Sequence, residues 1–351
     1  MWTPFQFFFL QYHSTSLAFN KAGVPNDIWE EYYGQPAENY TNANNTKPTI
    51  SSDFFLLLSN FKDFSDNVIN CQISSIRLLH SICTYTNINQ NSGSGGCISF
   101  IGRSSIVQDR FCSFKCYTPG SGKYSYTDVQ TEGNKSFVNL GSLYQCGHDN
   151  TGYSSIYHFY GNKTLISTNN TKTRSKNNAG YHFRYNSVYV NFCCFVSNDN
   201  HENDPCCMYH LNAPDSFVKR SLFKNNTCKT GSFWGLLSSD GSSKVTVSEC
   251  IFLENKADHT LASTYGGTLT AINCTGDLSV SSENGIVKTN EMTTSSFNLT
   301  LSLLSLGKCE AEFPFSFDFI LFGSKKKKKL VIDDLLSFNF SLECLFNLTS
   351  T

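Results

Sequence analysis

An eleven-residue pattern of apolar and polar positions recurs in the second half of the chain. Val245 to Asn255 and Val188 to Asn198 both fit V-x-V-x-x-C-x-F-x-x-N. Between them, Ser216 to Asn226 keeps the second valine, the phenylalanine and the asparagine, and has serine in place of the cysteine. Short runs of alternating apolar residues followed by a turn residue predict short β-strands.

The copies of this pattern are evenly spaced. Phe195, Phe223 and Phe252 recur with a period of about 28 residues. A fixed period of about 20 to 50 residues is typical of solenoids, in which stacked repeats bury a core that one repeat cannot bury alone. The positions expected to build this repeat are Val188, Val190, Cys193, Phe195, Asn198, Phe223, Asn226, Val245, Val247, Cys250, Phe252 and Asn255.

The pattern continues upstream in weaker form. Cys83-Thr-Tyr85, Cys112-Ser-Phe114 and Ser142-Leu-Tyr144 repeat the order of a small residue, one spacer and an aromatic residue. We therefore expect the three aromatic residues to join the phenylalanine stack. The shared cysteine position predicts a column of small inward residues, or a disulfide between Cys83 and Cys112 on adjacent coils.

Residue parity predicts a bend within each repeat. Val245 and Val247 share one face of a strand, whereas Cys250 and Phe252 have the opposite parity. All four can face inward only if the chain bends or bulges near Ser248-Glu249. Asn255 and its equivalents then follow the second strand, where asparagine tolerates the left-handed conformation, so we expect them to stack at one corner.

Paired glycines predict further corners. Gly95-Gly96 and Gly266-Gly267 each precede a short β-prone run, and glycine permits the positive φ of a tight turn. We treat the two pairs as one recurring element of the repeat.

Together these features predict an all-β chain, a right-handed parallel β-helix of about eight coils. An antiparallel β-sandwich is the alternative fold. The predicted organisation is an N-terminal segment or cap over 1–54, repeats over 55–295, and a C-terminal cap or tail over 296–351. Asp27 to Tyr33 is compatible with a helix, and the tail contains the cluster Lys325 to Lys329.

Composition and charge exclude several classes of protein. Ser, Thr and Asn form about 30% of the 351 residues and Ala is scarce, which disfavours an all-helical fold. The 27 basic and 28 acidic residues give a net charge of −1, so no nucleic-acid partner is expected. The apolar stretch Phe313 to Phe322 is too short for a transmembrane helix.

Candidate chemistry is sparse. A carbohydrate-active β-helix enzyme needs clustered carboxylates and a basic residue, yet Asp333-Asp334 lies in the tail and Gly147-His148-Asp149 has no basic motif downstream. His201, Cys206, Cys207 and His210 lack the separated pairs of a zinc site, so we interpret them as a loop insertion. We therefore predict no catalytic residue, no cofactor and no metal site.

The compartment is indicated only by weak signals. Ten N-x-[ST] sequons occur, and those within the repeats that we consider for N-glycosylation are Asn134, Asn162, Asn169, Asn225 and Asn273. The apolar run Phe5 to Leu10 has no basic residue before it and no cleavage site after it, and the 15 cysteines are an odd number.

The alternation of F-x-x-N with G-G-[small]-[Ile/Leu/Val] resembles the repeats of the polymorphic outer membrane proteins, surface adhesins that also have relatives in parasitic flagellate protists. The matching residues lie within about 60–290, and Cys97 and Thr268 stand where an alanine is usual. The resemblance implies a non-catalytic surface protein that binds a host or environmental molecule, either protein or glycan. Membrane association is left open.

We accordingly expect a secreted or cell-surface protein that serves as an adhesion or binding scaffold. Its rigid coils would carry variable loops over 117–135, 198–215 and 256–265, where recognition usually resides. A carbohydrate-active β-helix enzyme is the alternative.

Overall fold

The computed structural model describes residues 25–37, 40–148, 151–202 and 204–290, and these belong to two units of the chain. The described residues of the first unit are 25–37 and Tyr40. Its described part contains the helix α2 (Pro25–Tyr33), in which the rings of Trp29 and Tyr33 are 4.5 Å apart. The helix predicted near Asp27 is therefore confirmed.

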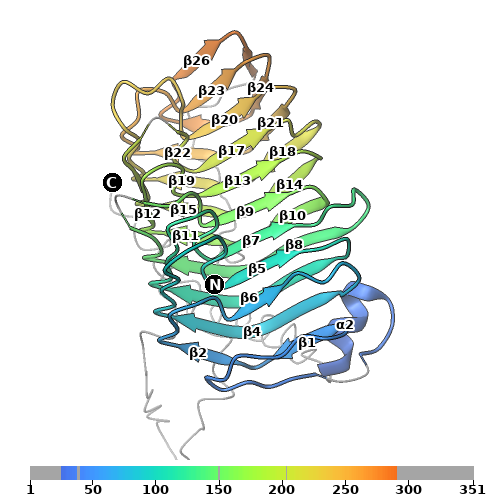
Figure 1. Ribbon diagram of the computed structural model, residues 1–351. Helices are drawn as coiled ribbons and strands as arrows, with labels where there is room; N and C mark the ends of the chain where they lie inside the picture. Colours follow the sequence, from blue (N-terminus) through green and yellow to red (C-terminus); the bar gives the residue numbers. More distant parts are fainter. Residues whose placement is uncertain (1–24, 38–39, 149–150, 203, 291–351) are drawn as a thin grey trace, which may run out of the picture. The chain divides into compact units, whose positions relative to one another are not determined.

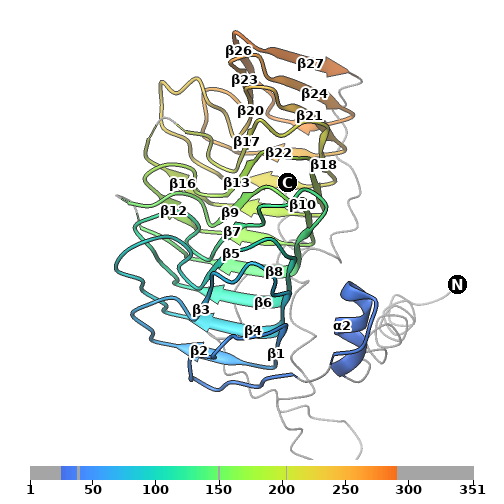
Figure 2. The same ribbon diagram turned by 45° about the vertical axis from the view of Figure 1, so that its right-hand side comes forward.

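The second unit contains a β-solenoid of about eight turns in its described residues (Figures 1 and 2). All pairings between the described strands are parallel, in a sheet of sixteen strands (sheet A), a sheet of nine (sheet B) and one pair, β12 (Arg174–Ser175) with β16 (Asp199–Asn200). A sandwich would require antiparallel pairs. The predicted parallel β-helix is confirmed.

Sheet A has two arms, and each coil contributes to both. The strands of the first arm are β1 (Phe54–Leu57), β4 (Leu78–Thr86), β6 (Ile106–Phe114), β8 (Lys135–Tyr144), β10 (Asn162–Ile166), β14 (Val188–Asn191), β18 (Ser216–Lys219), β21 (Lys244–Ser248), β24 (Thr268–Ile272) and β27 (Ile286–Asn290). Three of them, β4, β6 and β8, continue into the second arm. The remaining strands of the second arm are β2 (Asn60–Lys62), β11 (Asn169–Thr171), β15 (Cys194–Val196), β19 (Leu222–Lys224), β22 (Ile251–Leu253) and β25 (Thr275–Gly276).

The two arms meet at a left-handed residue. Glu249 has φ +54°, and its counterparts Phe192 and Arg220 have φ +53° and +46°. One such residue reverses the parity of the strand, so apolar side chains before and after it can all face inward. The bend predicted near Ser248-Glu249 is confirmed.

Sheet B forms the remaining wall of the solenoid. Figure 1 shows most of its strands one above another. They are β3 (Ile69–Cys71), β5 (Ile98–Ile101), β7 (Ser125–Asp128), β9 (Ile156–Phe159), β13 (Tyr181–Arg184), β17 (Met208–Leu211), β20 (Leu237–Asp240), β23 (Leu261–Thr264) and β26 (Val280–Glu283).

The interior contains the phenylalanine stack that the period predicts. Phe195 and Phe223 have ring centroids 5.0 Å apart with planes at 4°, and Phe223 and Phe252 are 4.7 Å apart at 9°. Val188, Val190, Val245 and Val247 are also buried in the same core. Equivalent residues of successive coils therefore lie over one another, as the even spacing of the pattern predicts.

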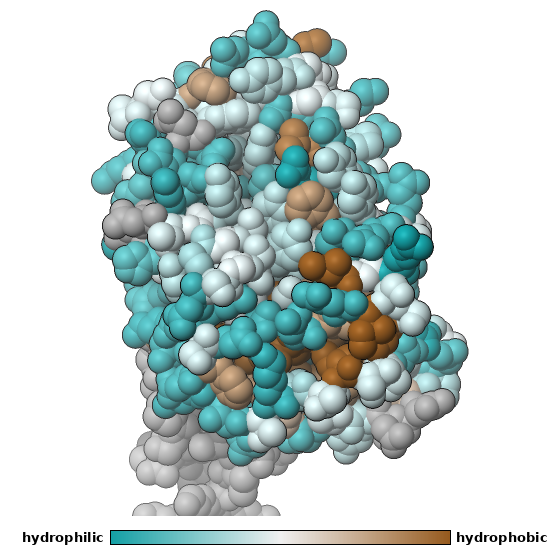
Figure 3. Space-filling model, viewed as in Figure 1, coloured by the Kyte–Doolittle hydropathy of each residue, from teal (hydrophilic) through white to brown (hydrophobic). Residues whose placement is uncertain are grey.

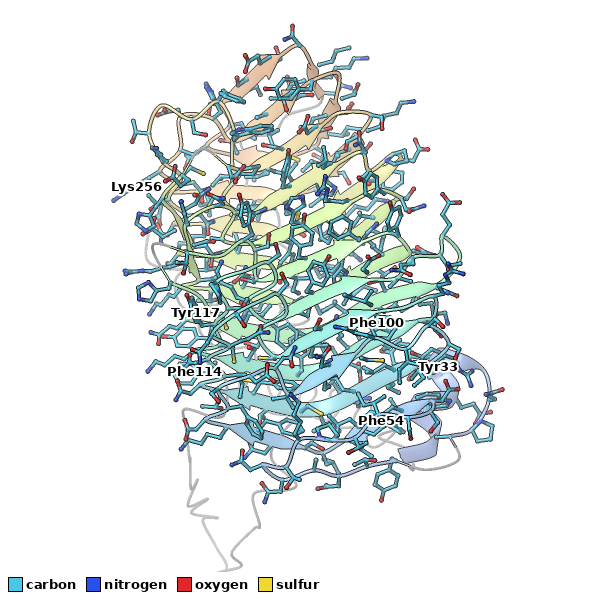
Figure 4. All side chains as sticks on the ribbon, viewed as in Figure 1. Tyr33, Phe54, Phe100, Phe114, Tyr117 and Lys256 are labelled. Carbon is cyan, nitrogen blue, oxygen red and sulfur yellow. The ribbon has the colours of Figure 1, made fainter. Side chains whose placement is uncertain are left out.

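In the coil that contains Cys112, the strand pairing is shifted by one residue from the register that the repeat predicts. Cys83 pairs with Phe111, and Cys112 pairs with Thr84, so the two cysteines point to opposite sides of sheet A. Phe114 likewise faces away from the interior (Figure 4), and on that outer side its ring stacks on the ring of Tyr144 at 5.8 Å. The predicted interior places of Phe114 and Tyr144, and the Cys83–Cys112 disulfide, are wrong.

The order of large and small residues explains this difference. Phe111 occupies the inward position that holds cysteine or serine in other coils, and Ser113 occupies the position of the stacked aromatic residues. The next coil accommodates the large ring with Gly141, because a Cβ at that glycine would collide with Phe111. In this coil the Cys112-Ser-Phe114 triplet therefore has the same order of small and aromatic residues, but Cys112 and Phe114 face outward.

The asparagines of the repeat form a ladder inside the second corner. The Asn226 Oδ1 accepts from the Asn198 N–H at 3.0 Å, and the Asn255 Oδ1 accepts from the Asn226 N–H at 3.0 Å. The left-handed residues are their predecessors, with φ +56° at Ser197 and +55° at Asn225. The predicted stack is confirmed, but the asparagines serve as hydrogen-bonding groups rather than as left-handed corner residues.

The two glycine pairs lie at different corners. Gly95 has φ +76° and Gly266 has φ +90°, as tight turns require. Gly96 and Gly267 lie against backbone carbonyls that a Cβ would strike. Gly95-Gly96 leads into β5 of sheet B, whereas Gly266-Gly267 leads into β24 of sheet A, so treating them as one recurring element was wrong.

The pairing of the solenoid extends beyond the predicted boundary at residue 55. Thr41 bridges Leu56 and Asn44 bridges Asn60, so part of the segment 1–54 already belongs to the first coil. The last described strand, β27, ends at Asn290. The predicted tail 296–351, including Lys325 to Lys329 and Asp333-Asp334, lies outside the described residues, as does Phe5 to Leu10.

Candidate functional site

The outer face of sheet B carries the most distinctive surface among the described residues. Its strands alternate, so that one set of side chains enters the core and the other faces outward. Two outward columns run across the coils. The first is Asn70, Ser99, Tyr126, Tyr157, His182, Tyr209, Ser238 and Ala262, and the second is Ile101, Asp128, Phe159, Arg184, Leu211, Asp240 and Thr264.

Four rings of the first column form a continuous row. Tyr126 and Tyr157 stack at 5.6 Å, whereas the ring pairs Tyr157–His182 and His182–Tyr209 are tilted, with centroids 4.3 Å and 4.6 Å apart. Phe159 lies beside this row, 5.0 Å from Tyr157. Tyr126 and Tyr209 at the two ends of the row are partly exposed, whereas Tyr157 and His182 between them are each only 6% exposed.

More aromatic residues border the row. Tyr160 and Tyr185 stack at 4.7 Å at the corner that follows sheet B, and both have positive φ. Trp234 lies 5.3 Å from Tyr209, and Tyr265, which is 61% exposed, lies 6.4 Å from Trp234. We call this surface the aromatic face, and it consists of Tyr126, Tyr157, Phe159, Tyr160, His182, Tyr185, Tyr209, Trp234 and Tyr265.

Charged groups lie within the aromatic face. The Arg184 guanidinium lies 5.1 Å from the Phe159 ring centroid and donates to the Tyr157 hydroxyl at 3.3 Å. Tyr209 donates to the Asp240 carboxylate, and burial together with this carboxylate raises the pKa of Tyr209. Asp128 is two coils from Arg184, and burial raises the pKa of its carboxyl group.

Asp204 is a further acidic group beside this surface. Burial, with a smaller contribution from the charge of Glu202, raises its pKa to about 6. Its charge also acts on Tyr209. Asp204 and Asp240 thus flank one tyrosine.

A hollow of about 310 Å³ lies at the beginning of the face, where β3, β5 and β7 adjoin the loop before β5. Its polar lining consists of Asn67, Asn70, Gln72, Gln90, Ser94 and Ser99. Gly93, Ile101 and the first ring of the row, Tyr126, complete it. We call this site the amide hollow.

The side of the solenoid drawn in Figure 1 is not predominantly hydrophobic. Most of it is hydrophilic or near neutral, and strongly hydrophobic side chains gather in one limited area (Figure 3). None of the described helices is long and apolar enough to cross a bilayer.

The predicted recognition loops are partly strands. The segment 117–135 contains β7, 198–215 contains β16 and β17, and 256–265 contains β23. The expectation that these segments are loops was therefore wrong for the strands they contain, and the segments supply Tyr126, Tyr209 and Tyr265 to the aromatic face. The cause is that short strands such as Ser125–Asp128 carry too few apolar residues to be recognised.

The predicted repeat residues build the interior rather than the site. The sequons are distributed differently: Asn162 and Asn225 are exposed, Asn273 is half-buried at a bend, and Asn134 donates to the Arg103 carbonyl at 2.6 Å. Asn169 is fully buried and accepts from Thr171, so the folded chain cannot present it for glycosylation.

The histidine and cysteine cluster is dispersed. His201 is exposed, Cys206 and Cys207 are buried with free thiols, and His210 points into the core from β17. Among the described residues, no three His, Cys, Asp or Glu side chains converge on a metal position.

Sequence reasoning missed the aromatic face, although a signal was present. The tetrads IYHF, YHFR and MYHL begin at Ile156, Tyr181 and Met208, and each lies one coil after the last. Each begins with an inward apolar residue and continues with an outward tyrosine or histidine.

Comparison with known proteins gives no relative from which the role of this surface could be inferred. No protein-family model, no curated protein and no solved structure matches the chain.

Proposed function

We propose that this chain is a non-catalytic β-helix protein that binds a glycan of a host or environmental surface through its aromatic face. The observation that carries the proposal is the aromatic face, in which Tyr160 and Tyr265 are exposed and Tyr126 and Tyr209 are partly exposed beside the buried rings of the row. Tyrosine, tryptophan and arginine are enriched in binding surfaces because they combine a large apolar area with a polar tip. The same residues dominate the binding energy of known interfaces.

The scaffold suits a binding role. The rings are attached to strands whose register is fixed by parallel pairing on both sides, as in β9, β13 and β17. Side chains held on such strands lose little further freedom when a partner binds, which favours affinity.

The spacing of the carboxylates favours binding over hydrolysis. Asp128 and Asp240 occupy the same column four coils apart, which corresponds to about 19 Å at the usual strand spacing. The two carboxyl groups of a glycosidase are about 5 to 9.5 Å apart. Asp240 is moreover engaged by the Tyr209 hydroxyl.

A carbohydrate-active enzyme is the second candidate, and one observation favours it. The carboxyl group of Asp204 has a pKa raised to about 6, which is suited to a general acid, and Asp240 is a nearby ionisable partner across Tyr209. This alternative predicts that reducing ends are released from a bound glycan and that Asp204→Asn abolishes the release.

A glycan array separates these functions. We expect the wild-type protein to retain at least one glycan without releasing reducing ends. The pair Tyr160→Ser and Tyr265→Ser should weaken retention at least tenfold, because both rings are exposed on the aromatic face. The control pair is Tyr189→Ser and Phe217→Ser, which removes two exposed rings from sheet A and should leave retention unchanged.

Each outcome of the glycan array either supports or overturns the proposed binding function. Retention of no glycan, or equal loss in the control pair, would overturn the proposal. Release of reducing ends that depends on Asp204 would replace it with the enzymatic function.

We also propose an extracellular or cell-surface location. Asn162 and Asn225 are exposed sequons and would be accessible to the oligosaccharide machinery. A glycosidase-sensitive mass shift is expected for protein from its native cell, and it should diminish in Asn162→Gln and Asn225→Gln but not in Asn169→Gln. Unglycosylated protein that fractionates with the soluble cytosol would contradict this location.

A further inference from the structure

The amide hollow is a separate feature at the end of the aromatic face. It is bounded by the outer sides of β3, β5 and β7 and by the loop that carries Gln90 and Ser94. Its volume of about 310 Å³ is at the small end of the range for ligand sites, so it suits a single ring rather than an extended molecule.

Two buried amides leave acceptors unused in this hollow. Asn67 is 3% exposed and Gln90 is 7% exposed, and neither the Asn67 Oδ1 nor the Gln90 Oε1 has a hydrogen-bond partner. Buried acceptors without partners are rare because burial removes their water. Both oxygens are shielded from solvent, so a ligand hydroxyl would satisfy them once the two side chains turn toward the hollow.

Tyr126 provides an apolar wall. One face of its ring stacks on Tyr157, 5.6 Å away with planes at 19°. One coil earlier the column holds Ser99 instead of another ring, so the second face of Tyr126 is turned toward the hollow that both residues line. A flat apolar face beside hydrogen-bonding amides is the arrangement that an amphipathic ring requires.

The charge of the hollow restricts the ligand further. None of its lining residues is ionisable at neutral pH, so a charged ligand would be desolvated without a counter-charge. From these features we propose that the amide hollow binds one neutral, polyhydroxylated six-membered ring, the terminal hexose of a glycan. The inference rests on the proposed function, because the rest of that glycan would follow the aromatic face from Tyr126.

Saturation-transfer NMR on the full chain tests this inference. The probes are methyl β-D-glucopyranoside, methyl β-D-galactopyranoside, methyl α-D-mannopyranoside and N-acetylglucosamine, with methyl β-D-glucuronide as the charged comparison. We expect saturation of at least one neutral probe, with the strongest transfer to the carbon-bound protons of one ring face. The glucuronide should bind at least tenfold more weakly.

Two variants identify the site. Gln90→Met keeps the length of the side chain but removes the free acceptor, and Tyr126→Ser removes the ring wall. Each should weaken binding of the neutral probe at least tenfold. Gln130→Met is the matched control, because Gln130 is exposed close to β7 but does not line the hollow.

The stability of Gln90→Met distinguishes a binding role from a structural one. Its acceptor has no partner in the protein, so the midpoint of urea unfolding should not fall. Absence of saturation for all four neutral probes at about 10 mM, unchanged binding in both hollow variants, or equal binding of the glucuronide would each overturn the inference. If the array still retains a glycan through Tyr160 and Tyr265 in that case, the proposed function stands without it.

Discussion

Lowering the pH from 7 to 5 is expected to remove about 6 kcal/mol of stability that three buried histidines contribute to the folded state. His80, His158 and His210 are fully buried, and burial lowers the pKa of each to about 3. In the unfolded chain a histidine has a pKa of about 6.5, so the unfolded state binds more protons between pH 6.5 and 3. The stabilisation is therefore complete above pH 6.5 and is lost as the pH falls, by about 2 kcal/mol per histidine at pH 5.

The surroundings of these rings support the sign of this effect. Neither nitrogen of His210 has a hydrogen-bond partner, and the His158 Nδ1 contacts only the Ser136 hydroxyl, at 3.1 Å. The charge of Lys163 lowers the pKa of both His158 and His210, while Asp109 partly opposes the effect of burial at His80. Within the described part of the chain, no carboxylate thus stabilises a protonated His158 or His210.

Urea unfolding followed by circular dichroism between pH 8 and 4 measures this dependence. Since a domain of this kind has a stability of about 5 to 15 kcal/mol, we expect acid unfolding at about pH 4.5. His210→Phe should lower the acid midpoint because it removes one titrating group from the core. His201→Asn, at an exposed position, should leave the midpoint unchanged. A stability that stays constant from pH 7 to 4.5 would show that these histidines are not buried in neutral form.

The later coils could be predicted from the sequence because one physical rule controls them. The inward columns there require valine before the bend and phenylalanine after it, and Val247 and Phe252 satisfy this as Val190 and Phe195 do. The earlier coils follow the same backbone path with different side chains. His80 and Gln108 occupy the column of Val190, and Phe111 and Ser113 reverse the order of large and small residues.

A single sequence does not reveal these exchanges of large and small inward residues, because the compensating residue lies in the neighbouring coil. Phe111 is accommodated by Gly141, which lies in the next coil and is remote from it in the sequence. The left-handed backbone conformation at the bend marks the repeat more reliably than the side chains do. Arg110 and Leu140 are left-handed like Glu249, but nothing in their chemistry announces a positive φ.

The candidate site was harder to predict than the core for a related reason. The outward positions of sheet B lie outside the hydrophobic core, and polar and aromatic residues both occur there, so Tyr126, Tyr157 and Tyr209 do not follow a hydrophobic period. The amide hollow depends on Asn67, Gln90 and Tyr126, which belong to three segments that are well separated in the sequence. Only the stacking of coils brings them together.

The substitution Asn226→Asp, which exchanges one amide nitrogen of the asparagine ladder for an oxygen, should be strongly destabilising. Asn226 is fully buried, and its Nδ2 donates to the Phe195 carbonyl at 2.9 Å and to the Asn255 Oδ1 at 3.0 Å. Asn226→Asp puts a carboxylate oxygen against both of these acceptors and buries a charge without a partner. We expect the free energy of unfolding to fall by about 3 to 5 kcal/mol at pH 7.5.

The adjacent residue provides a matched control. Asn225→Asp introduces the same charge at an exposed left-handed corner and should change stability by less than about 0.5 kcal/mol. Burial would raise the pKa of the carboxyl group at position 226, so the deficit of Asn226→Asp should shrink as the pH falls toward 6, whereas the control should show no such trend. Equal urea midpoints for the two variants at pH 7.5 would refute an inward asparagine ladder, because the exposed and the buried position would then be energetically alike.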